Sequence, residues 1–108
     1  MAFADTLKTL PTVAHLAALE LIDADSGAVV HTIENKPGQA GSLAVYNHLA
    51  AKFGAITPEA ARHGLGLYGE HTTDALTNPG KHPNIDRLIE LSTEGGRLLV
   101  KAVPADAG

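Results

Sequence analysis

The chain has 108 residues, of which 44% are hydrophobic and 19% are charged. These proportions indicate one globular domain, because disordered chains are poorer in apolar residues and richer in charge. The formal net charge of −4 argues against nucleic acid as a partner, since nonspecific affinity for nucleic acid comes from basic side chains that neutralise phosphates. The absence of cysteine excludes disulfide bonds, thiolate nucleophiles and cysteine-type zinc sites.

The amino-terminal segment, MAFADTLKTLP, lacks the features of a secretory signal. It has one lysine, the acidic Asp5 and no long apolar core. The longest apolar stretch in the chain, AHLAALELI, falls far short of the roughly 20 residues that span a bilayer. We therefore expect a cytoplasmic protein without a membrane segment.

The first part of the chain predicts a short helix and a β-hairpin. Apolar residues recur at spacings of four and three before Pro11, which would end an amphipathic helix. Residues 15–23 then alternate in polarity, and residues 29–33 are rich in β-branched side chains. Because residues 25–27 supply turn chemistry, these two runs are expected to pair as antiparallel strands.

Two helices are expected after the hairpin. The first is predicted to begin with Ser42 as its N-cap and to end at Gly54. The second has Thr57 as N-cap and Pro58 in its first turn, and its apolar periodicity continues as far as Pro79.

Glycines interrupt the second of these helices at positions 64, 66 and 69. Each glycine in a helix interior costs about 1 kcal/mol relative to alanine. Either the helix breaks at these glycines, or another part of the backbone comes close to them. If the helix is continuous, Ala75 and Leu76 lie on its apolar stripe and face the core.

The last part of the chain predicts a third helix, capped by Asn84, and a strand over residues 97–103. The fold class that follows is α+β, with a small antiparallel sheet covered by about three to four helices. The sheet consists of the hairpin and the C-terminal strand. We expect a single domain over residues 1–103 and a flexible tail over residues 104–108.

A first candidate site surrounds the rigid Asn-Pro-Gly turn. The turn is expected to fold back, so that Lys81 and His82 approach the helix that carries Glu70, His71 and Asp74. Glu70 and Asp74 are four residues apart, so their like charges repel unless a cation lies nearby. These five residues are the candidate catalytic groups.

Three residues of the same region, His71, Asp74 and His82, are candidate metal ligands. Imidazole and carboxylate donors would suit Zn, Mn or Fe without choosing among them, and the chain contains no HExxH motif. No cofactor is required by the sequence. Polar side chains of this kind are also expected in an ordinary connection between two exposed helices.

A second candidate site is ENKPGQAGS, residues 34–42. Glycines there precede a helix start, whose unpaired backbone N–H groups could bind a small anion. The candidate ligand-binding residues are Lys36, Gly38, Gly41 and Ser42. The segment has neither the Walker spacing nor GxGxxG, and tight turns need glycine for conformational reasons alone.

Four segments, FADTL, IENKPGQAGSLAVYNHLAAKFG, EHTTDA and NPGKHPNIDRL, together resemble a family of small bacterial proteins known only as a domain of unknown function. The resemblance extends over most of the chain. It implies a bacterial, soluble protein of a single domain. It implies no activity, cofactor or catalytic residue.

These features favour a non-enzymatic binding module for a protein partner or a small anion. Its functional surface would comprise the two Pro-Gly loops and the polar helix face, since loops on a rigid scaffold commonly carry binding sites. The alternative is a metal-dependent or acid-base enzyme that uses the Glu, His and Asp cluster of residues 70–86. In that enzyme a histidine would act as base, and Lys81 would stabilise negative charge.

Two further interpretations stay open. The net charge of −4 permits an adaptor whose acidic surface covers a basic partner. Leu67, which is expected to be exposed, and the neighbouring glycines could pack a helix pair between two chains of a homo-oligomer. The glycines could equally pack closely within one chain.

Overall fold

The computed structural model describes residues 3–105 of the chain. In this range a helix is followed by a hairpin, four more helices and a final strand. The elements are α1 (Phe3–Leu7), β1 (Leu16–Asp23), β2 (Val29–Glu34), α2 (Ala40–Phe53), α3 (Pro58–Tyr68), α4 (Glu70–Thr77), α5 (Pro83–Glu94) and β3 (Leu98–Pro104).

The three strands form one antiparallel sheet in the order β2-β1-β3, so the C-terminal strand pairs with the first strand of the hairpin. The register sets Leu19 of β1 opposite Ile33 of β2 and Ala102 of β3. Because side chains alternate along a strand, Leu19 and Ile33 lie on the same face, and both are fully buried. The predicted hairpin with an added C-terminal strand is confirmed.

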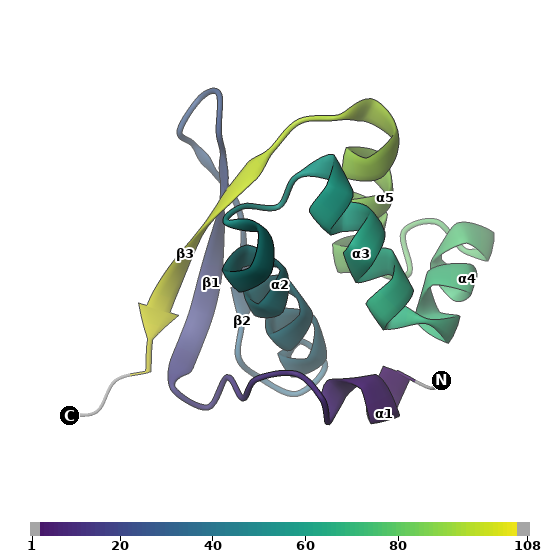
Figure 1. Ribbon diagram of the computed structural model, residues 1–108, viewed down its shortest axis with the longest axis horizontal. Helices are drawn as coiled ribbons and strands as arrows, with labels where there is room; N and C mark the ends of the chain where they lie inside the picture. Colours follow the sequence, from purple (N-terminus) through teal and green to yellow (C-terminus); the bar gives the residue numbers. More distant parts are fainter. Residues whose placement is uncertain (1–2, 106–108) are drawn as a thin grey trace.

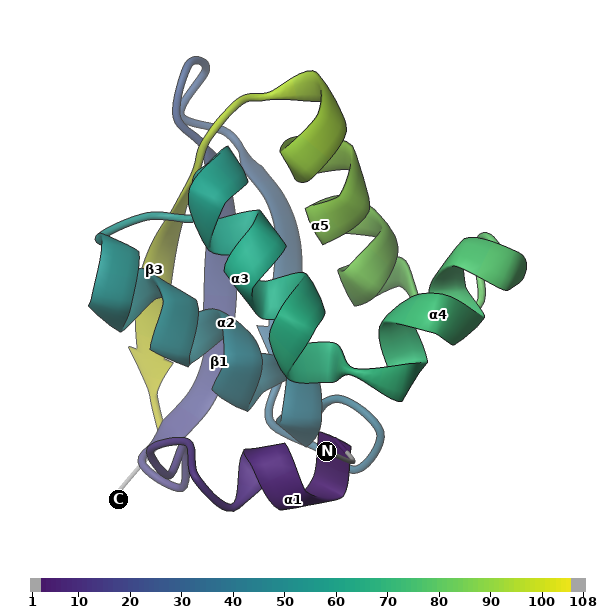
Figure 2. The same cartoon turned by 45° about the vertical axis from the view of Figure 1, so that its right-hand side comes forward.

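All the described helices lie on one side of this sheet (Figures 1 and 2). α2 lies against the sheet, and α3 packs on both α2 and α5. The core between these layers is apolar and holds no buried charged side chain among the described residues. Its largest fully buried side chains are Tyr46, Leu19, Leu21, Ile33, Leu43, Leu49, Ile56, Leu88 and Val45. The α+β fold class predicted from the sequence is confirmed.

The helix predicted from Pro58 onward breaks at Gly69, which ends α3 and begins α4. Gly69 has a φ of 58° and a ψ of −119°, a conformation that side chains with a Cβ rarely adopt. The break changes the phase of the helix, so Leu76 is 61% exposed, while Ala75 is buried. The expectation that Leu76 faces the core was therefore wrong.

The glycine at position 64 is used for close packing. A Cβ on Gly64 would lie 2.7 Å from Cδ1 of Leu49 and 2.8 Å from Cδ1 of Leu88. The neighbours are side chains of α2 and α5, and not another backbone. Leu67, expected to be exposed, is partly buried and packs against the core. In this structure Gly64 and Leu67 thus pack within one chain.

The sequence correctly predicted the residues that end α2 and begin α3. Gly54 follows α2 in the left-handed conformation, with a φ of 80°, and its N–H donates to Ala50 O. Thr57 accepts a hydrogen bond from the backbone N–H of Ala60, and proline occupies the first turn of α3. The predicted helix end and N-cap are confirmed.

Two other predicted N-caps were wrong. Ser42 lies inside α2, because a turn in which Lys36 O accepts from Ala40 N starts the helix three residues earlier than predicted, with Gln39 as the N-cap. Asn84 lies inside α5, which begins at Pro83 after His82. The Asn84 side chain accepts a hydrogen bond from a guanidinium instead of capping the helix. The Asn84 side chain thus bonds within its own helix, whereas the Ser42 hydroxyl contacts Tyr68 of α3.

The C-terminal residues fall into two groups. Pro104, where the flexible tail was expected to begin, is the last residue of β3. The N–H of Ala105 donates to His15 O at 2.9 Å. The rest of the expected tail, residues 106–108, lies outside the described residues.

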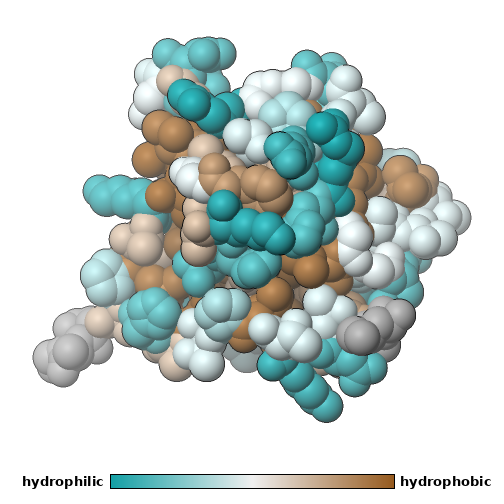
Figure 3. Space-filling model, in the orientation of Figure 1, coloured by the Kyte–Doolittle hydropathy of each residue, from teal (hydrophilic) through white to brown (hydrophobic). Residues whose placement is uncertain are grey.

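The surface mixes polar and apolar residues. On the face displayed in Figure 3, apolar residues form separate patches with hydrophilic residues between them. The large hydrophobic side chains with the greatest exposure are Leu99, Val29, Val30 and Leu76. Among the described residues, no helix has both the length and the apolar character needed to cross a membrane.

Candidate functional site

The two candidate regions of the sequence meet at one hollow of about 440 Å³. One wall comes from the start of α2, and the opposite wall from the start of α5 with the residues just before it. α1, the end of α3 and the start of α4 complete it. The lining residues are Phe3, Leu7, Gly38, Ala40, Gly41, Ser42, Tyr68, His71, Lys81, His82, Pro83, Asn84 and Ile85.

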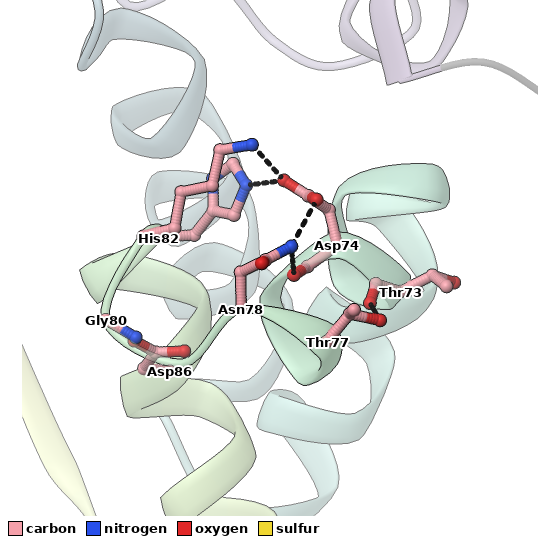
Figure 4. A network of polar contacts seen from close by, with 8 residues as sticks. Thr73, Asp74, Thr77, Asn78, Gly80, His82 and Asp86 are labelled. Atoms are coloured by element: carbon pink, nitrogen blue, oxygen red, sulfur yellow. Dashed lines mark hydrogen bonds and ion pairs between the residues drawn. The ribbon is translucent and has the colours of Figure 1, made fainter.

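The Asn-Pro-Gly turn brings two basic residues back to α4. Nε2 of His82 lies 2.6 Å from Oδ2 of Asp74 (Figure 4). Lys81 Nζ lies 3.0 Å from the same oxygen. Asp86 stabilises the turn by accepting a hydrogen bond from the N–H of Gly80 at 2.9 Å. The predicted fold-back of the turn is confirmed by these contacts.

Asp74 is held as a carboxylate by its neighbours. The hydrogen bonds from His82 and Lys81 lower the pKa of Asp74 to about 2. Since the carboxylate accepts from Nε2, a neutral His82 would carry its proton there and leave Nδ1 as a hydrogen-bond acceptor. Asp74 itself does not line the hollow, so it fixes His82 and Lys81 from outside.

The expected grouping of Glu70 with these residues is not found. Glu70 accepts a hydrogen bond from the backbone N–H of Phe3 at 2.9 Å, and it does not line the hollow. Hydrogen bonds from its own N–H and from that of Phe3 lower the pKa of Glu70. Because α4 begins at Glu70, its carboxylate lies where helix N–H groups are unpaired. Glu70 therefore connects α1 to α4.

His71 joins the site through ring contacts. Its ring centroid lies 5.8 Å from that of His82 and 5.2 Å from that of Phe3. Within residues 3–105, no group of three or more His, Cys, Asp or Glu side chains is arranged to hold a metal ion. The candidate ligands His71, Asp74 and His82 do not form such a group.

The glycine-rich segment supplies the opposite wall, but without its lysine. Lys36 forms an ion pair with Glu34 at 3.2 Å and does not line the hollow. The backbone N–H groups of Gly41 and Ser42 have no hydrogen-bond acceptor among the described residues. Both belong to the first turn of α2, where N–H groups point out of the helix end. They are available to a bound molecule.

Glycine at position 41 also allows α1 to lie close to α2. A Cβ at this position would lie 3.2 Å from Cε2 of Phe3. The Phe3 ring in turn stacks on Tyr68, with the two centroids 5.1 Å apart. Apolar side chains from α1 and α3 thus form one side of the hollow.

Tyr68 was predicted only as a core residue with a polar tip. Its hydroxyl donates to Oγ of Ser42 at 2.7 Å, and burial raises its pKa well above the ordinary value. The side chain therefore supports the start of α2 and also lines the hollow. The apolar helix pattern indicated burial, but gave no indication that Tyr68 borders a site.

Tyr46 fixes the start of α5. Its hydroxyl donates to Asn84 O at 2.5 Å and accepts from Nη1 of Arg87 at 3.2 Å. The same guanidinium donates to Oδ1 of Asn84 at 2.8 Å. Burial raises the pKa of Tyr46 to about 12, so the hydroxyl remains protonated and keeps this donor. The position of the α5 start is thus set from α2.

The hollow contains no carboxylate among its lining residues, although the chain has 12 acidic residues. It has the side chains of Lys81, His71 and His82, and it lies at the starts of α2 and α5. A helix start carries a partial positive charge, because its N–H groups are unpaired and the peptide dipoles are aligned. The hollow is therefore electrostatically suited to an anion.

No curated protein and no solved structure shows a significant match to the chain. A family model does match, over residues 3–102, and this range includes the hollow and every helix and strand except the end of β3. The model is described as an uncharacterized protein conserved in bacteria. The chain therefore belongs to this bacterial family, DUF2322.

Proposed function

We propose that this protein binds a small organic anion in the hollow between α1, α2 and α5. The observation that carries the proposal is the charge of the lining, which holds one lysine and two histidines but no acid. Lys81 is the charged side chain of the lining, and Asp74, which does not line the hollow, pairs with it from outside. An anion would experience attraction from the basic groups of the lining and from two helix starts.

The donors on the two walls are suited to one anionic group. Gly41 and Ser42 offer unpaired backbone N–H groups from α2, and Asn84 offers one from the first turn of α5. Phosphate and carboxylate groups commonly bind to such helix-start donors. Lys81 supplies a full positive charge on the same side as α5.

The apolar side of the hollow indicates what accompanies the anionic group. Phe3, Leu7 and Ile85 line it together with the stacked ring of Tyr68. Ligand sites typically combine an apolar wall with a few polar groups that fix orientation. We infer a ligand with an apolar or aromatic body and one carboxylate or phosphate group.

Isothermal titration calorimetry with phenyl phosphate tests this proposal. Lys81→Gln is expected to weaken binding about tenfold, because it removes a charge-assisted contact. Lys36→Gln is the matched control, since Lys36 is also an exposed lysine paired with a carboxylate, but it lies outside the hollow. This control should bind phenyl phosphate like the unmodified protein.

Two further ligands test the roles of the apolar wall and of the anionic group separately. Inorganic phosphate should bind more weakly than phenyl phosphate, because it cannot use the apolar wall. Benzylamine has an aromatic ring but a positive charge, so it should not bind measurably. Binding of benzylamine as tight as that of phenyl phosphate would contradict the proposal, and so would equal effects of Lys81→Gln and Lys36→Gln.

The contact between Asp74 and His82 favours a second candidate function, in which His82 transfers a proton to or from the bound molecule. A carboxylate that holds one ring nitrogen orients the imidazole and leaves the other nitrogen for catalysis. Hydrolysis rates of p-nitrophenyl phosphate and p-nitrophenyl acetate would be compared for the unmodified protein and His82→Gln. Equal rates would remove this candidate for both classes of ester.

A further inference from the structure

A second hollow, of about 450 Å³, lies between α4 and α5 and shares no lining residue with the first. Its apolar part comes from Leu76 and Pro79 on one side and Ile89 on the other. Its polar part comes from α5, where Asp86, Glu90 and Glu94 line it. We call this hollow, defined by these six residues, the acidic groove.

The apolar part of the acidic groove lies at the edge of the core, and one of its side chains is largely exposed. Leu76 is 61% exposed, because the break at Gly69 turns it away from the core. Ile89 is only partly buried. Large aliphatic side chains that remain exposed beside a hollow are typical of a surface that binds another protein.

The three acids form a row along α5. They are spaced by four residues, so they lie on one face of the helix and extend over about 12 Å. Carboxylates at this spacing repel each other by a few tenths of a kcal/mol per pair. Asp86 is partly compensated by the N–H of Gly80. Among the described residues, Glu90 and Glu94 form no ion pair.

The position of Glu94 adds to this excess of negative charge. It is the last residue of α5, where the helix end is already partially negative, and the last turn contains no basic residue. Acids are unfavourable at a helix end of this kind. A positively charged partner beside the groove would relieve the repulsion.

We propose that the acidic groove docks an amphipathic helix of a partner protein, with Lys or Arg residues beside a stripe of aliphatic side chains. The aliphatic stripe would contact Leu76 and Ile89, and the basic residues would face Glu90 and Glu94. Helices bind to grooves through side chains at positions i, i+3, i+4 and i+7. Complementary charge directs such a helix and rejects acidic ones. This surface is separate from the anion-binding hollow.

Selection of random 16-residue peptides against the immobilised protein tests the proposal without a known partner. The selected peptides should be enriched in Lys or Arg and should carry aliphatic residues at helical spacing. A synthetic copy of the most enriched peptide, labelled with a fluorophore, would then be titrated by fluorescence anisotropy. Its affinity should fall as salt is raised, because the charges lie at the rim of the groove.

Protein variants test whether the selected peptide binds in the acidic groove. The double variant Glu90→Gln and Glu94→Gln, and separately Leu76→Ser, should each weaken the peptide about tenfold or more. Glu59→Gln is the control, since Glu59 is an exposed acid in the first turn of α3, outside the groove. All these side chains are exposed, so the variants are expected to fold, which circular dichroism would verify.

Three results would overturn the proposal. Selection could enrich no basic peptides, or the enriched peptide could bind the groove variants as tightly as the unmodified protein. Sedimentation could also reveal a dimer that Leu76→Ser dissociates, in which case a second copy of the chain occupies the groove. Failure of this test leaves phenyl phosphate binding unaffected, because the two hollows have no residue in common.

Discussion

The carboxylate of Asp74 and the imidazole of His82 lie 2.6 Å apart, although the two residues are eight positions apart in the sequence. This contact connects α4 to the residues that precede α5. Lys81 binds the same carboxylate oxygen at 3.0 Å. Asp74 therefore holds two of the three positively ionisable side chains of the hollow in place.

The effect of Asp74 on stability should depend on pH. Its pKa of about 2 lies below the ordinary value, so the ionised form is favoured in the folded state. Stability from this group is therefore present above about pH 4 and is lost as pH falls toward 2. Urea unfolding at several pH values should show that Asp74→Asn is destabilised at pH 6 and approaches the unmodified protein at pH 2. A difference independent of pH would contradict this account.

Two glycines of α3 should respond oppositely to substitution. Gly64→Ala should destabilise the protein, because its Cβ would overlap the buried side chains of Leu49 and Leu88. Gly66→Ala should stabilise it by about 0.5–1 kcal/mol, since nothing lies within 4 Å and alanine favours helix. We expect unfolding free energies that differ by about 1–3 kcal/mol between the two variants. Equal stabilities would show that Leu49 and Leu88 move aside freely.

Tyr46 should contribute stability that is lost in alkali. Because its pKa is raised to about 12, its protonated form is favoured in the folded state, and this stabilises the protein below about pH 10. Stability should fall as pH rises from 10 toward 12. Tyr46→Phe loses the bond to Asn84 O and should cost about 1 kcal/mol at pH 7. The deficit of this variant should shrink between pH 10 and 12, as measured by urea unfolding, and a constant deficit would refute the assignment.

Glu70 should hold α1 in place and have no direct role in the hollow. Glu70→Ala removes the acceptor for the N–H of Phe3, so hydrogen exchange at that amide should become faster. Exchange in the middle of α5 should stay as it was. If exchange at Phe3 is unchanged, Glu70 does not fix α1.

The sequence correctly predicted the helices and strands whose boundaries are set by neighbouring residues in the chain. Thr57 and Pro58 start α3 because a cap and a fixed φ act on adjacent residues. The alternation of β1 and the β-branched run of β2 likewise predicted the hairpin. In contrast, Ser42 resembled a cap by type, but a turn at Lys36 started the helix earlier.

The candidate site was predictable in part. The fold-back of Lys81 and His82 followed from turn chemistry, and a free N–H group at Ser42 followed from a glycine-rich helix start. The same pattern also predicted a free N–H at Leu43, which instead donates to Gln39 O because the helix begins earlier. That both regions form one hollow depends on the hydrogen bonds of Tyr46 to Asn84 and of Tyr68 to Ser42, which are long-range contacts. Sequence spacing alone carries no information about such distances.

Binding of an organic anion in the hollow can be followed through the amide chemical shifts during a titration with phenyl phosphate. We expect saturable shifts of the amides of Gly41, Ser42 and Asn84, with a common dissociation constant, while the amide of Glu94 stays in place. If these three amides do not shift, or if neutral benzyl alcohol shifts them as strongly at equal concentration, the hollow is not an anion site.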